Sequence, residues 1–525
     1  MIQRRLYLYI VAAVSLGMLL VGLTNLGSTT LNTVLGVNSG SAFKDAIAGF
    51  GAVTLVGLPV WLIHWVIAQR LASRHPDERV SALRRLYVYV VLAATAIAAT
   101  IFLRRLLEDG FGLLLGSTSD GAAVARAAWG SVVLVAFWLY HFRIAAADRI
   151  EGHEVGTSAT LRRWYAYGLL LLGFAFLLFG ARNLLEQVWV LLADGRQTIA
   201  FGGLIPAALA GMLTGLLVWG FHARWTAHEP LLTDDRRSTL RAVQGFLVLA
   251  GSVALALIGA SQLLYYALAR GLGIQQPGGV SGNLLAALAG PASTLVVFAL
   301  AWVWVRQQLA ADAGETEAAR QAGVRRLYTH LVALFALATL AVGAAGLLWT
   351  LSDHLLNPLL GRNVGEWRDR ASLFTTLALV GTPMWLTHWH AAPDLRERFT
   401  LSRRLYLYAA LLGSVLALLI SGAVLLYRLL GLILSTSDAS SDAAVVDAGR
   451  STSVILVAVA LGLYHWRLLR ADSAARPAAA PEPSYSGQRF VVTILGTNEE
   501  QIRGLLRGLP GGARYSLESR DISNL

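Results

Sequence analysis

Cysteine is absent from all 525 residues of the sequence. This absence excludes disulfide bonds, thiolate zinc sites, iron–sulfur clusters and covalently attached haem. Charged residues are also scarce, at 14%, whereas 56% of the residues are hydrophobic. A soluble globule of this length needs more polar surface than such a composition supplies. The composition therefore predicts an integral membrane protein.

Ionisable side chains are missing from the middle of the long apolar segments. Proton- and ion-coupled transporters generally need such groups at that depth, so the absence weakens a coupled-transport function. The sequence also contains no phosphate-binding glycine loop, metalloprotease helix motif or nucleophile elbow. We therefore predict no catalytic residues and no metal site, and we do not expect an enzyme.

A short motif of two arginines and an aromatic residue opens the apolar segments and recurs along the chain. Guanidinium groups remain with headgroups and water while tyrosine lies at the interface, so the motif is typical of a helix entering a bilayer. Its starts are about 78 to 84 residues apart if a weaker copy at Arg241 is counted, which fits two membrane-crossing helices with their loops. The predicted interface anchors are Arg4, Arg5, Tyr7, Arg84, Arg85, Tyr87, Arg162, Arg163, Tyr165, Arg325, Arg326, Tyr328, Arg403, Arg404, Tyr406, Trp65 and Trp389.

The apolar segments predict twelve membrane-spanning helices. Each is about 17 to 25 residues long, which is enough to cross about 30 Å of hydrocarbon. The first is too long for a signal-peptide core and lacks a cleavage motif, so we expect it to remain as a helix. The predicted spans are residues 6–26, 47–67, 86–106, 124–143, 164–185, 201–222, 243–266, 284–305, 327–351, 371–389, 405–428 and 452–467.

A longer repeat groups these spans in fours. Residues 55–65 match residues 379–389 at an offset of 324, and residues 139–141 match residues 463–465 at the same offset. The predicted fold class is therefore an all-α polytopic membrane protein with three tandem four-helix units. The units are residues 1–150, 151–315 and 316–470, and the second half of the middle unit has diverged.

A four-helix unit with aromatic entries and histidine–aromatic exits resembles the bacterial membrane family described as domain of unknown function 5671. Residues 1–470 show this resemblance in three copies. The resemblance implies a four-helix membrane module without an assigned activity. The middle copy departs from the pattern, because Val305 stands where an exit histidine is expected.

The composition changes after the last predicted span. Residues 471–487 are rich in alanine and proline and predict an extended linker. Residues 488–525 predict a small soluble α/β element, a strand–helix–strand, because residues 489–495 and 514–519 alternate and residues 497–500 form a capping box. So short a segment cannot enclose a core. We expect it to bind a protein partner or to self-associate, and a tail without function is the alternative.

Arginine is about twice as frequent in the loops on the entry-motif side as in the loops on the other side. The positive-inside rule then predicts a multi-pass protein of the cytoplasmic (inner) membrane with both termini in the cytoplasm. The net charge of +12 is spread over helix ends rather than gathered on one basic face, so the lipid bilayer is the expected partner and nucleic acid is not.

Histidine recurs at the exits of the even-numbered spans, at His64, His141, His222, His388 and His465. The favoured interpretation is an anchor that hydrogen-bonds a headgroup or a neighbouring entry tyrosine or arginine. The alternative is a b-type haem, with His64 and His141 as one ligand pair and His388 and His465 as another. The favoured interpretation involves no cofactor.

Three functional classes follow, in order of preference. The first is a membrane scaffold, sensing or assembly protein whose cytoplasmic tail recruits a partner. The second is an uncoupled transporter or channel, and the third is the haem redox module. The sequence names no substrate for any of them.

Overall fold

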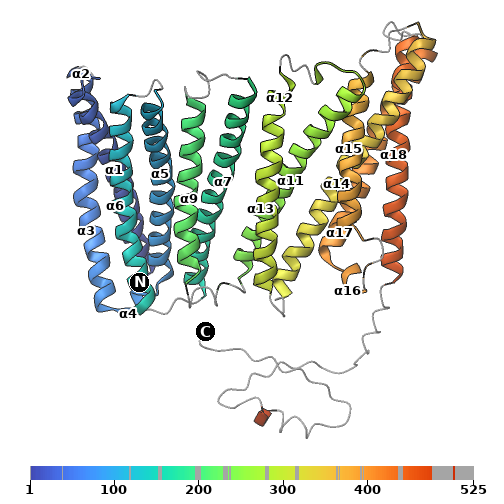
Figure 1. Cartoon of the computed structure of the whole chain (residues 1–525). Coiled ribbons are helices and arrows are strands. Elements are labelled where there is room, and N and C mark those ends of the chain that lie inside the picture. The colour runs from blue at the N-terminus through green and yellow to red at the C-terminus, as the bar shows by residue number, and fades with distance from the viewer. Residues whose placement is uncertain are drawn as a thin grey trace. The chain divides into compact units, whose positions relative to one another are not determined.

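The structure is a computed structural model that describes residues 2–37, 40–116, 120–151, 156–194, 203–228, 235, 238–277, 283–313, 319–361, 365, 367–390, 393, 395–434, 441–475 and 500–502. Every regular element in these ranges is a helix, and no strand occurs in them (Figure 1). The chain divides into two compact units, Met1–Ser473 and Ala474–Leu525.

The first unit is built from successive pairs of long helices. Pair one is α1 (Ile2–Val34) with α3 (Ala52–Arg74), and pair two is α5 (Ala82–Leu114) with α6 (Gly121–Glu151). Pair three is α7 (Thr157–Asp194) with α9 (Ile205–Thr226), and pair four is α11 (Thr239–Gly271) with α13 (Ala289–Ala313). Pair five is α14 (Ala319–Leu359) with α15 (Trp367–His388), and pair six is α17 (Leu401–Ile433) with α18 (Ser441–Ala474). Shorter elements are α2 (Gly40–Ala46), the π-helical η1 (Ile47–Gly51), α4 (Pro76–Arg79), α12 (Leu284–Ala287) and α16 (Leu395–Arg398).

Eleven helices in the described part of the chain are long and apolar enough to cross a membrane, where the sequence predicts twelve spans. The remaining predicted span, residues 371–389, does form a helix, α15. Threonine, proline and histidine, such as Thr376, Pro383 and His388, lower the hydropathy of α15 below that of the other long helices. Length and composition therefore define a multi-pass helical protein.

Glycine lets the two helices of a pair pack with their backbones in contact. A Cβ atom on Gly57 of α3 would lie 2.9 Å from the backbone nitrogen of Leu19 on α1. A Cβ atom on Gly381 of α15 would lie 2.6 Å from the backbone nitrogen of Leu340 on α14. Gly57 and Gly381 are 324 residues apart, so the repeat preserves this crossing point.

Each pair packs against the next pair along the chain. Helix α1 packs on α6, α5 on α9, α7 on α13, α11 on α15 and α14 on α17, and the order of the pairs can be followed by colour in Figure 1. Three buried apolar clusters lie among the described residues of this unit, and the largest draws residues from pairs one, two and three. A structure whose repeats contact mainly their neighbours is organised like a solenoid.

Other sequence predictions concern parts that the structure does not test. The two predicted tail strands lie outside the described residues, which include only the helical residues 500–502 of the tail. These three residues fall within the helix predicted after the capping box. The division of residues 1–470 into three four-helix units stays a prediction.

Candidate functional site

The first tyrosine of the entry motif, here called the entry tyrosine, lies beside the exit histidine of the same pair. This contact occurs in five pairs, and only pair four lacks both residues, with Gln244 and Val305 in their places. The ring centroids are 5.7 Å apart for Tyr7–His64, 6.0 Å for Tyr87–His141, 5.4 Å for Tyr165–His222, 6.4 Å for Tyr328–His388 and 5.6 Å for Tyr406–His465.

Hydrogen bonds define the tautomer of these histidines. Nδ1 of His222 lies 2.8 Å from the carbonyl oxygen of Val218, and Nδ1 of His465 lies 2.8 Å from that of Leu461. A carbonyl oxygen only accepts, so Nδ1 carries the proton. Nε2 then accepts from the tyrosine hydroxyl, at 3.0 Å for Tyr165–His222 and 3.1 Å in pair six. Both nitrogens of each ring are therefore engaged.

A tryptophan three residues before the exit histidine connects one pair to the next. Its indole nitrogen donates to the entry tyrosine of the following pair, and we call the contact region between two pairs a junction. The bonds are Trp61–Tyr87 at 3.3 Å, Trp138–Tyr165 at 2.9 Å and Trp385–Tyr406 at 2.8 Å. One tyrosine hydroxyl thus accepts from the previous pair and, in pairs three and six, donates to a histidine of its own pair.

A second tryptophan link forms at two of these junctions. Trp65 donates to the Tyr140 hydroxyl at 2.7 Å, and Trp389 donates to the Tyr464 hydroxyl at 2.9 Å. Both residues of each link are 324 residues from their counterparts. The junction between pairs one and two is therefore reproduced between pairs five and six.

Pairs one and six differ from the inner pairs in the exposure of their motif tyrosines. Tyr7 is 62% exposed, whereas Tyr87 is only 4% exposed. Tyr408, the second tyrosine of its motif, is 58% exposed. Gly462 occupies the linking tryptophan position in pair six. These positions are the ones that form junctions between the inner pairs.

The motif arginines bind carboxylates in the last turns of the second helix of the same pair or shortly after that helix. The distances are 2.8 Å for Arg5–Glu78, 2.7 Å for Arg84–Asp148, 2.8 Å for Arg162–Asp235, 2.6 Å for Arg241–Asp312 and 2.7 Å for Arg403–Asp472. The side chains of Arg84 and Asp148 are 1% and 4% exposed. A charge buried to that extent requires such a partner.

The structure thus places several predicted interface anchors inside the helix bundle. Arg84, Arg85, Arg162 and Arg403 are buried, as are Tyr87, Tyr165, Tyr406, Trp65 and Trp389, whereas Arg4, Tyr7 and Arg325 are exposed and Arg5, Arg163, Arg326, Tyr328 and Arg404 are half-buried. Their depth in a bilayer stays a prediction. Sequence reasoning missed the carboxylate partners, although a signal was available: an acidic residue follows each of the five paired arginines by 64 to 73 positions.

Asp235 lies outside the membrane-spanning helices and has the largest number of motif partners. Burial alone would raise the pKa of its carboxyl, but hydrogen bonds from Arg162 and Arg163 outweigh burial and lower the pKa below its usual value. The Tyr167 hydroxyl also donates to Asp235, at 3.0 Å. This carboxylate therefore remains ionised and holds the entry motif of pair three.

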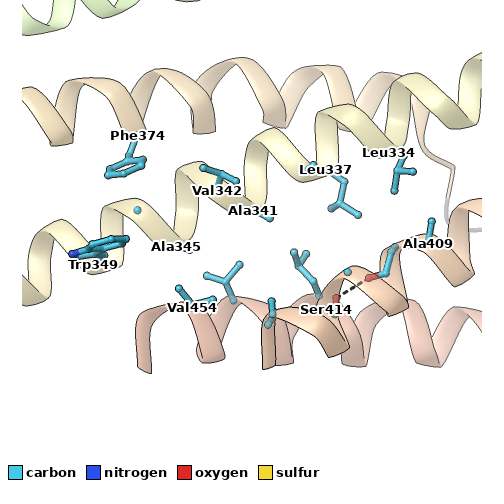
Figure 2. A pocket seen from close by; sticks show the side chains of 18 residues that line it. Leu334, Leu337, Ala341, Val342, Ala345, Trp349, Phe374, Ala409, Ser414 and Val454 are labelled. Atoms are coloured by element: carbon cyan, nitrogen blue, oxygen red, sulfur yellow. Dashed lines mark hydrogen bonds between the residues drawn. The ribbon is translucent and has the colours of Figure 1, made fainter. Parts of the chain in front are cut away.

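Figure 2 shows an apolar cavity of about 350 Å³ between α14, α15, α17 and α18. Leucine, valine and alanine form most of its lining, and Trp349 and Phe374 lie at one end. The Ser414 hydroxyl donates to the Ala410 carbonyl of its own helix at 2.9 Å. No charged side chain lines this cavity, so it offers only an apolar surface.

A larger cavity of about 1030 Å³ lies at the junction between pairs four and five. Its lining includes the linking tryptophan Trp302, the entry tyrosine Tyr328 and the exit histidine His388. Three arginines and one aspartate also line it: Arg241, Arg306, Arg325 and Asp312. This junction is therefore open where the other tryptophan–tyrosine junctions are closed by hydrogen bonds.

The four histidines considered as haem ligands have different neighbours. His64 contacts Tyr7, whereas His141 contacts Trp61, Trp65, Tyr87 and Tyr140. His388 lines the cavity at the junction of pairs four and five, whereas His465 lies against Trp389, Tyr406 and Tyr464. Within the described ranges, no group of three or more histidine, aspartate or glutamate side chains could hold a metal ion.

The fold and its junctions define a multi-pass helical membrane protein made of internal repeats. The chain belongs to the family described as Domain of unknown function (DUF5671), whose model matches residues 5–137, 163–287, 246–348 and 326–451. Three of these matches begin at the second arginine of an entry motif, at Arg5, Arg163 and Arg326. Comparison with curated proteins and with solved structures gave no match.

Proposed function

We propose that the protein is a membrane scaffold or assembly protein in which the helix pairs form a rigid series and the tail recruits a partner. The observation that carries this proposal is that the recurrent polar side chains bind other side chains of the protein. Motif arginines of five pairs bind carboxylates. Linking tryptophans donate to entry tyrosines at three junctions, and two of these tyrosines also bind an exit histidine. Groups engaged in this way hold helices together and are not free to act on a substrate.

The tail, residues 488–525, is the proposed interaction element. We infer that it binds a cytoplasmic protein or a second copy of this chain, because so short a segment does not bury a core of its own. Rigid repeats would then supply a fixed membrane platform for the recruited partner.

The test is to remove residues 485–525 and to compare what co-purifies with the full chain and with the shortened chain. A matched control keeps the linker and scrambles the order of residues 488–525. We expect both variants to retain the membrane unit, judged by thermal unfolding, and to lose the same associated proteins. If both variants keep the full set of associated proteins, the tail does not recruit a partner.

The scaffold proposal includes a topology with both termini in the cytoplasm of a cell with an inner membrane. Its support is the arginine excess on the entry-motif side of the chain. Fusions of a cytoplasm-dependent and a periplasm-dependent reporter to each terminus test it. Activity of the periplasm-dependent reporter at either terminus would refute the topology and the site assigned to the tail.

The same contacts give the haem alternative less support than the scaffold. Iron would bind the Nε2 lone pair, which in His465 already accepts a hydrogen bond from Tyr406. An absorption spectrum of the purified protein tests the alternative. A Soret band that weakens in His64→Ala or His141→Ala would restore the haem module and displace the scaffold.

A further inference from the structure

The cavity between pairs four and five exists because two aromatic residues are replaced. At the junction of pairs one and two, the space is filled by two aromatic side chains that are hydrogen-bonded to each other. They are Trp65, which follows the exit histidine His64, and Tyr140, which precedes the exit histidine His141. The corresponding positions at the junction of pairs four and five are Arg306, which follows Val305, and Thr387, which precedes His388. Both residues line the cavity.

Among the described residues of this junction, the hydrogen bond between the linking tryptophan and the entry tyrosine is also missing. Trp302 stands three residues before Val305, and Tyr328 is the entry tyrosine of pair five. Across the part of the chain that the structure describes, neither the Trp302 indole nor the Tyr328 hydroxyl forms a hydrogen bond, and both side chains line the cavity. The Arg306 guanidinium lies 5.7 Å over the Trp302 ring.

The lining is divided into a charged end and a long apolar part. The charged end lies at the helix termini on the entry-motif side, where Arg241, Arg306, Arg325 and Asp312 line the cavity. Along α11 the lining continues from Arg241 to Ala260, which at 1.5 Å per residue is about 28 Å. The acyl chains of one phospholipid cover a single leaflet, about half of the hydrocarbon thickness of about 30 Å, so the lining is long enough for both the headgroup and the chains.

We propose that this cavity binds one phospholipid with an anionic headgroup. Arg306 and Arg325 contact the headgroup phosphate, and the acyl chains follow the apolar walls formed by Val253, Ala256 and Ala299. Arg241 is paired with Asp312, and Arg306 adds a positive charge at the same end, which favours an anionic lipid over a zwitterionic one. The cavity volume, about 1030 Å³, slightly exceeds the usual range of ligand pockets, about 300–1,000 Å³, as a ligand larger than most small molecules requires.

The experiment uses the full chain, purified in detergent and titrated with phosphatidylglycerol or with phosphatidylcholine, with bound lipid counted by native mass spectrometry. We expect one phosphatidylglycerol molecule per chain and at least tenfold weaker binding of phosphatidylcholine. Equal binding of the two lipids would overturn the proposal. Inorganic phosphate should not displace phosphatidylglycerol; displacement would reveal an anion site without lipid specificity and would also overturn it.

Variants locate the site. Arg306→Gln and Arg325→Gln should each weaken phosphatidylglycerol binding about fivefold, the effect of about 1 kcal/mol per arginine. The matched controls are Arg224→Gln and Arg4→Gln, which remove exposed arginines from corresponding helix ends outside the cavity. Equal losses in the controls would mean that the lipid binds the basic surface in general.

A second variant tests the apolar part without changing the charge. Ala299→Phe should occupy the wall and reduce lipid binding at least tenfold while both arginines remain. Leu300→Phe is the control, because Leu300 is 66% exposed and does not line the cavity. Thermal unfolding of each variant establishes that it folds. Normal binding in a folded Ala299→Phe variant would contradict the assignment.

Discussion

The junction between pairs one and two and the junction between pairs four and five use the same linking residues with opposite results. In the first, Trp61 donates to Tyr87 and the space is filled by Trp65. In the second, Trp302 and Tyr328 face a cavity of about 1030 Å³. The linking tryptophan and the entry tyrosine are therefore not sufficient to close a junction. Closure also requires the second aromatic pair, whose side chains fill the space between the pairs.

The largest difference between the junctions should come from their ion pairs. Asp148→Asn should lower the free energy of unfolding by about 3–5 kcal/mol, because it leaves the buried Arg84 charge unpaired beside Trp65. Asp312→Asn should cost no more than about 1 kcal/mol, because Arg241 and Asp312 are 20% and 19% exposed and line the cavity. Denaturant unfolding in detergent measures both, and equal costs would refute the comparison.

The next largest effect on the free energy of unfolding should come from removing the hydroxyl of an entry tyrosine. Tyr165→Phe leaves the indole nitrogen of Trp138 and Nε2 of His222 without their partner, at about 1–3 kcal/mol for each buried group. Tyr328→Phe is the matched variant at the open junction, where we expect a change within about 0.5 kcal/mol. The comparison fails if the Tyr328→Phe variant loses as much stability as the Tyr165→Phe variant.

Added volume should separate closed regions from open ones. Ala166 is fully buried in the cluster shared by pairs one, two and three, so Ala166→Leu should cost about 1–3 kcal/mol by overpacking. Ala256 lines the open cavity, and Ala256→Leu should leave the free energy of unfolding within about 0.5 kcal/mol. Thermal unfolding in detergent measures both variants, and a large cost at Ala256 would show that the junction is closed.

Most of the fold could be predicted from the sequence, because hydropathy and the recurrence of the entry motif are local features. Within the described residues, each of the twelve predicted spans overlaps a helix, although the hydropathy of α15 is too low for it to join the eleven candidates for membrane crossing. The helices extend beyond the predicted spans, as α5 does to Leu114. Hydropathy marks the apolar part of a helix, whereas the backbone continues the helix into polar sequence.

The candidate site was predictable only in part. The contact between an exit histidine and an entry tyrosine was one expected option, and the structure shows it in pairs three and six as a hydrogen bond. The burial of Arg84 beside Asp148 was not expected, since an arginine pair at a helix entry has the same pattern whether it faces headgroups or a carboxylate. The open junction depends on Arg306 and Thr387, which come from different helices and become adjacent only in the fold.

The smallest expected effect on stability near neutral pH is that of Asp235. Burial alone would raise the pKa of its carboxyl, but the hydrogen bonds from Arg162 and Arg163 lower this pKa in the folded protein. A carboxyl with a depressed folded pKa stabilises the protein above its unfolded pKa, about 3.9, and the contribution is lost as pH falls through the folded value. We therefore expect the stability contributed by Asp235 to be constant between pH 8 and 6 and to decrease below about pH 4. In Asp235→Asn this acid-dependent loss should be smaller, and an unchanged profile would contradict the role of Asp235.

The most direct test of the account is a double-mutant cycle on the Trp138–Tyr165 link, repeated on Trp302 and Tyr328. Each cycle combines tryptophan-to-phenylalanine and tyrosine-to-phenylalanine changes and measures the free energy of unfolding of the full chain. The account predicts a coupling energy of about 0.5–1.5 kcal/mol for Trp138 with Tyr165, which are 2.9 Å apart, and a coupling near zero for Trp302 with Tyr328. Zero coupling at the first junction, or equal coupling at both, would contradict it.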